Sequence, residues 1–206
     1  MKIAFIGDIH GYLPALESAL EICHDENIDV IVGLGDYIDG FDANDACVEL
    51  ARSHFDHAVS GNHDELHAGD LAPGNRDWLC GLPTELTLNG WLVTHSSPRA
   101  DRQGEYVNSS IMAWNCFDDF DFQRCVVGHA HYGQLYQFNS KKSVDCDEIE
   151  LTAAGIKLMP DQRYLLANPS LAYNRDFDRR PAFCILDNAT SCLRVIVLEM
   201  PPLFEH

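Results

Sequence analysis

Five short segments rich in Asp, His and Asn constrain this sequence most, because each comes directly after an apolar, strand-like run. They are Gly7–Gly11, Gly35–Gly40, Gly61–Asp64, Thr94–Ser96 and Gly128–His131. Open α/β sheets place their ligand sites at the carboxyl ends of strands, and flanking glycines let the backbone turn sharply and approach a ligand closely. A fold that brings these strand ends together therefore gathers the polar side chains into one site.

The N-terminal half alternates strands and helices, which predicts βαβ units and a parallel sheet. Strand-like apolar runs cover Lys2–Gly7, Val30–Leu34 and His57–Ser60. Between the first two runs, apolar residues recur with helical spacing over about Leu13–His24, and a second helix is expected near Asn44–His54.

Beyond Arg124 the pattern is almost entirely β. Upstream of it, Asn89-Gly90 joins two strand-like runs, Glu85–Leu88 and Trp91–Thr94, and predicts a hairpin. The later expected strands are Cys125–Val127, Gln134–Phe138, Ile156–Met159, Tyr164–Ala167, Ala182–Leu186 and Leu193–Leu198. The polar residues 139–150 are interpreted as a mobile loop. A chain that starts parallel and ends antiparallel predicts two mixed sheets packed face to face, with helices outside.

Composition is typical of one globular domain, which we expect to cover residues 1–206. The chain is 46% hydrophobic and 22% charged, and its length allows a sizeable core. Its net charge of -18 argues against a nucleic-acid polymer as partner, because duplex binding depends on Lys and Arg that neutralise phosphates. A small phosphorylated ligand in a local pocket remains compatible with that charge.

We expect the protein to be cytoplasmic. The apolar run after Met1-Lys2 is too short for a signal peptide, and no stretch approaches the ~20 apolar residues of a membrane span. The eight cysteines are scattered without a C-x-x-C pair, which is typical neither of a disulfide framework nor of a thiolate zinc site.

The donor types in the five segments indicate a metal centre. Asp8 and His10 are two positions apart, as are His129 and His131, so an extended backbone would point both side chains of a pair the same way. Carboxylate, imidazole and amide oxygen donors without thiolate suit Mn, Zn, Fe or Ni. One carboxylate can also bridge two ions roughly 3.5–4 Å apart.

Together the segments resemble the calcineurin-like metallophosphoesterase superfamily, whose pattern is D-x-H, G-D-x-x-D, G-N-H-D/E, H and G-H-x-H in that order. The resemblance runs from residue 3 to about residue 131. It implies an α/β fold, a four-layer αββα sandwich of two mixed β-sheets flanked by helices. It also implies two divalent metal ions, manganese first, with Fe, Zn, Ni or Mg as alternatives. The implied reaction is hydrolysis of a small phosphodiester or phosphomonoester, with nucleotide-derived esters included, by a hydroxide that bridges the metals.

The resemblance assigns a role to each residue. One metal would be held by Asp8, His10, Asp36 and His131. The other would be held by Asp36, Asn62, His95 and His129. His63 would be the general acid towards the leaving oxygen, and Asp64 would orient its ring. Asp39 is interpreted as shaping the loop after Asp36, and His67 as a surface residue.

The C-terminal third resembles a bacterial subgroup of small single-domain phosphoesterases, through Arg163–Ser170, Arg175-Asp176 and Phe183–Asp187. That subgroup usually carries Asn-Pro-Gly-Ser where this chain has Asn168-Pro169-Ser170. The candidates for contacts with a substrate phosphate are Arg99, Arg102, Asn168, Ser170 and Arg175.

Two other interpretations stay open. One is a serine/threonine protein phosphatase, although those relatives carry G-D-x-x-D-R-G and favour G-N-H-E, whereas this chain has Gly40 and Asp64. The other is a non-catalytic scaffold with the same fold, which typically lacks metal ligands, whereas here every ligand position is filled. The sequence leaves the oligomeric state open.

Overall fold

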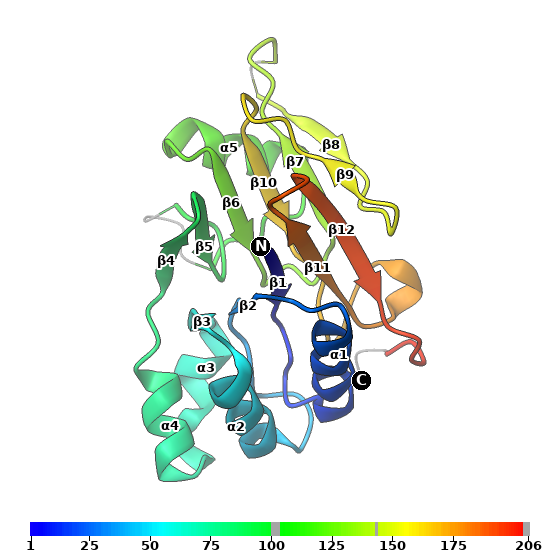
Figure 1. Ribbon diagram of the computed structural model, residues 1–206. Helices are drawn as coiled ribbons and strands as arrows, with labels where there is room; N and C mark the ends of the chain where they lie inside the picture. Colours follow the sequence, from blue (N-terminus) through cyan, green and yellow to red (C-terminus); the bar gives the residue numbers. More distant parts are fainter. Residues whose placement is uncertain (100–103, 143, 204–206) are drawn as a thin grey trace.

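Two six-stranded sheets form the centre of the computed structural model, which describes residues 1–99, 104–142 and 144–203 (Figure 1). The first sheet has the order β3 (His57–Ala58), β2 (Val30–Gly33), β1 (Lys2–Ile6), β11 (Ala182–Asp187), β12 (Cys192–Val197) and β9 (Ile156–Lys157). The second has the order β4 (Glu85–Leu88), β5 (Trp91–Thr94), β6 (Arg124–Val127), β10 (Tyr164–Ala167), β7 (Gln134–Gln137) and β8 (Asp147–Ile149).

Both sheets are mixed. In the first, β1, β2 and β3 run parallel, and β11 joins the other edge of β1 antiparallel. In the second, β5, β6 and β10 run parallel, and the remaining pairs are antiparallel. Since the carboxyl ends of parallel strands meet at one edge, this arrangement brings the segments after β1, β2, β5 and β6 towards one another.

Helices cover the outer face of each sheet. They are α1 (Leu13–Asp25), α2 (Asn44–His54), α3 (Asn62–His67), α4 (Pro73–Cys80) and α5 (Ser110–Asp119), with short 3-10 turns η1 (Ala68–Asp70) and η2 (Phe177–Arg179). Buried side chains of α1, α2 and α4 pack on the first sheet, and those of α5 pack on the second. Across the described ranges, no helix is long and apolar enough to cross a membrane.

Three apolar cores separate four layers, and strand β1 shows why. Ile3 and Phe5 belong to the core between the two sheets, whereas Ala4 and Ile6 belong to the core beneath the helices. This follows from the period of two in a strand, which sends successive side chains to opposite faces. The predicted αββα sandwich of two mixed sheets is therefore confirmed.

The elements that the sequence failed to predict are mostly short helices. Helix α5 was not among the expected elements, although Ser109 caps it by accepting the N–H of Met112 at 3.4 Å. Helices α3 and α4 are too short for a clear 3.6-residue period. The interpretation of residues 139–150 as a loop is wrong at its end, where β8 pairs with β7.

Candidate metal centre

The ligand segments leave their strands through left-handed turns. The φ angles are +52° at Asp8, +47° at His10, +66° at His129 and +53° at His131. The expectation of extended backbone at both pairs is therefore wrong. Asp and His are among the residue types that tolerate this region best, which suits their presence here. The turn after β1 is held in place by the turn after β2, because the N–H groups of Asp8 and His10 donate to Gly35 O and Asp36 O, each at 3.0 Å.

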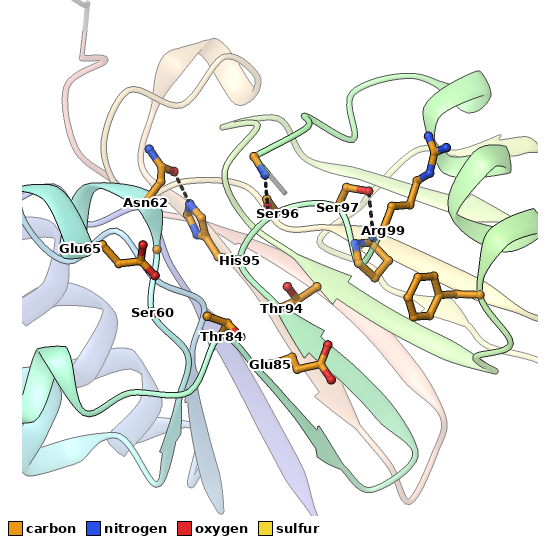
Figure 2. A pocket seen from close by; sticks show the side chains of 14 residues that line it. Ser60, Asn62, Glu65, Thr84, Glu85, Thr94, His95, Ser96, Ser97 and Arg99 are labelled. Atoms are coloured by element: carbon orange, nitrogen blue, oxygen red, sulfur yellow. Dashed lines mark hydrogen bonds between the residues drawn. The ribbon is translucent and has the colours of Figure 1, made fainter. Parts of the chain in front are cut away.

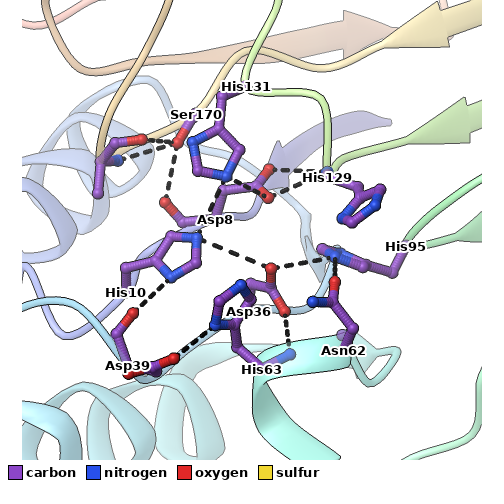
Figure 3. A network of polar contacts seen from close by, with 12 residues as sticks. Asp8, His10, Asp36, Asp39, Asn62, His63, His95, His129, His131 and Ser170 are labelled. Carbon is purple, nitrogen blue, oxygen red and sulfur yellow. Dashed lines mark hydrogen bonds and ion pairs between the residues drawn. The ribbon is translucent and has the colours of Figure 1, made fainter. Parts of the chain in front are cut away.

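These turns bring all of the predicted metal ligands to one place, where they form two groups that share Asp36 (Figure 3). The first group is Asp8, His10, Asp36 and His131, and the second is Asp36, His95 and His129. Within each group the potential ligand atoms all lie within 4.8 Å of one another. Asn62 joins the second group, because its Oδ1 lies 3.1 Å from Nε2 of His95.

Backbone carbonyls hold three of the imidazoles in position. Nδ1 of His10 donates to Asp39 O at 2.9 Å, and Nδ1 of His95 donates to Leu34 O at 2.7 Å. Nε2 of His129 donates to Gly104 O at 3.0 Å. Once a ring is neutral, the proton on this donating nitrogen leaves its other nitrogen free of a proton, which is the arrangement that metal-binding histidines need.

Asp36 tests whether a cation fits here. One of its oxygens accepts the N–H of His63 at 3.0 Å. The other, Oδ2, is buried and accepts no hydrogen bond from the described residues, although Nε2 of His95 lies 3.2 Å away and Nε2 of His10 lies 3.7 Å away. A buried carboxylate oxygen normally has a partner. An unpartnered carboxylate oxygen that lies close to both ligand groups is therefore suited to a divalent cation as its partner.

The protonation of the centre also suits cations. Burial lowers the pKa of His129 to about 4 and that of His131 to about 3, so both rings are neutral near pH 7. Burial raises the pKa of Asp8 to about 7. Burial alone would lower the pKa of His95, but the carboxylates of Asp36 and Asp8 and the hydrogen bond to Leu34 O together outweigh it and raise that pKa to about 9. The centre therefore holds protons in the places that metal ions would take.

The prediction that Asp64 orients the ring of His63 is wrong. The Asp64 carboxylate is buried and accepts the backbone N–H groups of Asp36, Tyr37 and Gly61, each at 2.8 Å. It therefore ties the turn after β2 to the start of α3. The sequence could not separate this role from that of an orienting carboxylate, because either role suits an acid next to His63.

Asp39 is the carboxylate that contacts His63. Its Oδ2 lies 2.6 Å from Nδ1 of His63. Its backbone also helps to shape the loop, with φ at +68° and its N–H donating to Asn44 Oδ1 at 3.1 Å. His67, which was interpreted as a surface residue, reaches the same oxygen of Asp39, with Nε2 at 3.1 Å. His67 follows His63 by four residues, and this spacing could have indicated from the sequence that both side chains lie on the same face of a helix.

A cavity of about 350 Å³ opens beside Asn62 and His95 (Figure 2). Its walls carry hydroxyl and carboxylate groups from Ser60, Glu65, Thr84, Glu85, Thr94, Ser96 and Ser97. Arg99, one of the candidates for a substrate contact, also lines it, with its guanidinium paired to Asp119 and, at 3.3 Å, to Glu105. The cavity places polar groups next to the second ligand group.

The structure separates the remaining substrate candidates. Asn168 is only 1% exposed and its amide donates to Pro169 O at 2.8 Å, which contradicts a direct contact with substrate. Ser170 is buried as well, and its hydroxyl donates to Asp8 O at 3.0 Å, so it supports a ligand. The backbone N–H of Arg175 donates to His131 O at 2.8 Å, which places this residue beside the centre. Arg102 lies outside the described residues.

Two tyrosines beside the centre were not predicted. The ring of Tyr106 stacks on that of His129, with centroids 4.2 Å apart and an interplanar angle of 8°. The ring of Tyr173 lies 5.7 Å from that of His10. No motif marked either residue, because stacking partners follow from the tertiary arrangement alone.

Gly40 faces the centre through its backbone. A Cβ atom at this position would lie 2.8 Å from both Cβ and O of His10. A side chain would therefore clash with a metal-ligand segment, and the arginine that protein phosphatases carry in this position does not fit the present backbone.

This fold and this arrangement of ligands define a metal-dependent phosphoesterase. A model of the calcineurin-like phosphoesterase family matches residues 1–147, and the chain belongs to that family. The family uses divalent metal ions to hydrolyse phosphate esters of small phosphorylated substrates, and the two ligand groups provide a place for such ions.

The chain is also similar to individual proteins over most of its length. A crystal structure of a metallophosphoesterase from Sphaerobacter thermophilus superposes with a TM-score of 0.87 at 26% identity, covering 98% of this chain and 90% of the other. An uncharacterized protein of Methanocaldococcus jannaschii is 27% identical over 96% of this chain and 87% of its own length. Serine/threonine-protein phosphatase 1 of Salmonella typhimurium is 37% identical over 70% of this chain and 65% of its own length.

Proposed function

We propose that the chain hydrolyses small phosphodiesters or phosphomonoesters with two divalent cations. One would be held by Asp8, His10, Asp36 and His131, and the other by Asp36, Asn62, His95 and His129. The observation that carries this proposal is the position of Asp36, which belongs to both ligand groups and has a buried oxygen without a hydrogen bond from the described residues. Cations bound in this way would neutralise the phosphate and activate a water molecule for in-line attack.

His63 is the proposed general acid. It is part-exposed, at the start of α3, and its ring centroid lies 4.9 Å from that of His10 at the first ligand group. The Asp39 carboxylate accepts its Nδ1–H, which fixes the tautomer and leaves Nε2 for proton transfer to the leaving oxygen. Asp39 therefore takes the orienting role, whereas Asp64 holds the surrounding backbone.

Manganese is the cation that we propose first, with Fe, Zn, Ni or Mg as alternatives. Nitrogen and oxygen donors without thiolate suit all of the borderline ions among them. The cavity beside Asn62 and His95, with Arg99 in its wall, is the proposed place for the organic part of the substrate. Arg175 is a second proposed contact for the phosphate, because its backbone is bonded to that of His131.

A protein phosphatase is the second candidate, favoured by the 37% identity to a serine/threonine-protein phosphatase. The steric environment of Gly40 speaks for the small-ester proposal, because it leaves no room for the arginine of the protein phosphatase motif. A comparison of substrates decides between the two candidates.

The test uses metal-free protein reloaded with manganese. It should hydrolyse nitrophenyl phosphate or bis-nitrophenyl phosphate, and His63→Ala and Asp36→Asn should abolish turnover. His57→Ala is the matched control, because His57 is an exposed histidine on β3 and belongs to neither ligand group. Turnover of a phosphopeptide far above that of both nitrophenyl esters would favour the protein phosphatase. Protein that binds no metal and turns over no ester would favour a scaffold.

A further inference from the structure

A second cluster of metal-binding side chains lies outside the two buried ligand groups. His63 and His67 are four residues apart on α3, so both side chains project from one face of the helix. Their ring centroids lie 6.0 Å apart with an interplanar angle of 25°. Two histidines at this helical spacing are a recurrent way of binding zinc in proteins.

Asp39 supplies a third donor to this cluster. Its Oδ2 lies 2.6 Å from Nδ1 of His63 and 3.1 Å from Nε2 of His67. The potential ligand atoms of all three residues lie within 4.8 Å of one another. Two imidazoles and one carboxylate are a donor set that zinc accepts, usually with water in its fourth position.

The cluster is open to solvent, unlike the buried centre. The side chains of Asp39, His63 and His67 are 38%, 35% and 50% exposed. An ion from solution can therefore reach them without passing the two ligand groups, and water can complete the coordination.

The surroundings of the cluster are acidic. Asp39 and His67 lie in the wall of a cavity of about 660 Å³ that is also lined by Asp42, Asp45 and Asp70, with no Lys or Arg among its described lining residues. A concave surface lined by one sign of charge concentrates ions of the opposite sign. The Asp45 Oδ1 accepts the N–H of Ala72 and the amide of Asn75, and because these donors are neutral, its charge adds to those of Asp42 and Asp70 in attracting an ion.

We propose that Asp39, His63 and His67 form a third divalent-cation site, selective for zinc, and that zinc bound there slows hydrolysis. An ion on Nδ1 of His63 takes the place of the proton that Asp39 accepts. Zinc thereby replaces the hydrogen bond through which Asp39 orients the ring, and it holds His63 at the third site and away from the position in which Nε2 would reach the leaving oxygen. The site itself stands on its own geometry, whereas the effect on turnover rests on the proposed function of His63.

The binding test counts zinc ions and requires no turnover. The full chain is saturated with zinc, and the bound ion is measured by elemental analysis and by calorimetric titration. The wild type should bind one zinc more per chain than His67→Ala or the more conservative His67→Gln. His57→Ala, which changes an exposed histidine away from the cluster, should match the wild type. Equal zinc counts in the wild type and both His67 variants would overturn the site and leave Asp39, His63 and His67 as a hydrogen-bonded chain.

The activity test adds zinc to manganese-loaded protein. Zinc should slow the wild type roughly tenfold or more, because a general acid contributes about 10²–10⁴-fold to such reactions. His67→Ala, which removes none of the proposed catalytic groups, should start near the wild-type rate and resist zinc. Equal inhibition of both proteins would overturn the inhibitory role and assign the effect to exchange at the buried centre. If no form of the protein hydrolyses an ester, the proposed function fails, whereas the zinc count still decides the third site.

Discussion

Asp39 and His63 are joined by a contact of 2.6 Å between Oδ2 and Nδ1, although they belong to different segments of the chain. Asp39 lies in the turn after β2, and His63 lies at the start of α3. The carboxylate therefore couples the segment that provides Asp36 to the segment that provides the proposed acid. Because the carboxylate fixes the orientation and the tautomer of the imidazole, this contact should affect proton transfer more than metal binding.

Replacement of Asp39 with Asn tests whether this contact affects proton transfer and leaves metal binding unchanged. The amide keeps the size of the side chain but is a weaker acceptor for the Nδ1–H of His63 and holds the ring less firmly. We therefore expect kcat to fall by roughly 10–100-fold, as for other residues that orient a functional histidine. Manganese content should stay unchanged, since Asp39 belongs to neither buried group. Steady-state kinetics and elemental analysis measure the two quantities. Asp42→Asn is the matched control, and an unchanged kcat in Asp39→Asn would contradict the assigned role.

Replacement of Asp64 should reduce the stability of the fold, in contrast to Asp39, whose replacement should reduce kcat. Its removal in Asp64→Ala leaves three buried N–H groups, those of Asp36, Tyr37 and Gly61, without their present acceptor. Since each unsatisfied buried group costs about 1–3 kcal/mol, the free energy of unfolding should fall by roughly 3 kcal/mol or more. Urea unfolding of the metal-free protein measures this loss. A variant as stable as the wild type would show that water replaces the carboxylate.

The difference between these two acids marks the limit of what the sequence predicts. Most strands, the two mixed sheets and the polar segments that meet at the metal centre could be predicted from the sequence, whereas the order of strands within each sheet was not predicted. The carboxylate that contacts His63 could not be predicted, because Asp39 and Asp64 both belong to the motif segments G-D-x-x-D and G-N-H-D. Only the path of the turn after β2 decides which of the two faces the ring. The stacking of Tyr106 on His129 likewise depends on tertiary packing.

Backbone conformation limited the prediction in a second way. Alternation along a strand correctly placed the two residues of each pair in one site but assigned them an extended backbone, whereas Asp8 and His129 adopt φ angles of +52° and +66°. Those angles go with hydrogen bonds between loops. The N–H of Asp8 donates to Gly35 O, and the N–H of His129 donates to the Asp8 carboxylate at 3.0 Å. Interactions between distant segments leave no mark in a local pattern.

Metal content should depend unequally on the ligands. Asp36 belongs to both groups, whereas His131 belongs only to the first. Asp36→Asn should therefore lose both manganese ions, and His131→Gln should lose one and retain the other. Elemental analysis after exhaustive dialysis gives the counts, and circular dichroism confirms that the variants are folded. Retention of both ions by Asp36→Asn would show that the carboxylate does not bridge them.

Metal binding should strengthen as the pH rises through neutrality. In the metal-free protein burial raises the pKa of Asp8 to about 7. Burial opposes the charged form of His95, but the carboxylates of Asp36 and Asp8 and the hydrogen bond to Leu34 O together raise its pKa to about 9. Both groups must lose their protons to bind a cation, so protons compete with the metal below each of these values. The apparent affinity should rise by about tenfold per pH unit for each proton displaced between about pH 6 and pH 9.

Calorimetry in two buffers of different ionisation enthalpy measures these protons directly, because the heat of binding then differs by the heat of buffer protonation. We expect release of more than one proton per chain at pH 6 and of fewer at pH 9. His54→Ala, which changes an exposed histidine on α2, should give the same proton count as the wild type. Affinity that is flat from pH 6 to pH 9 would mean that Asp8 and His95 are already unprotonated before the metal arrives. In that case the attraction between Nε2 of His95 and Oδ2 of Asp36, which lie 3.2 Å apart, would be too weak to keep the His95 ring protonated.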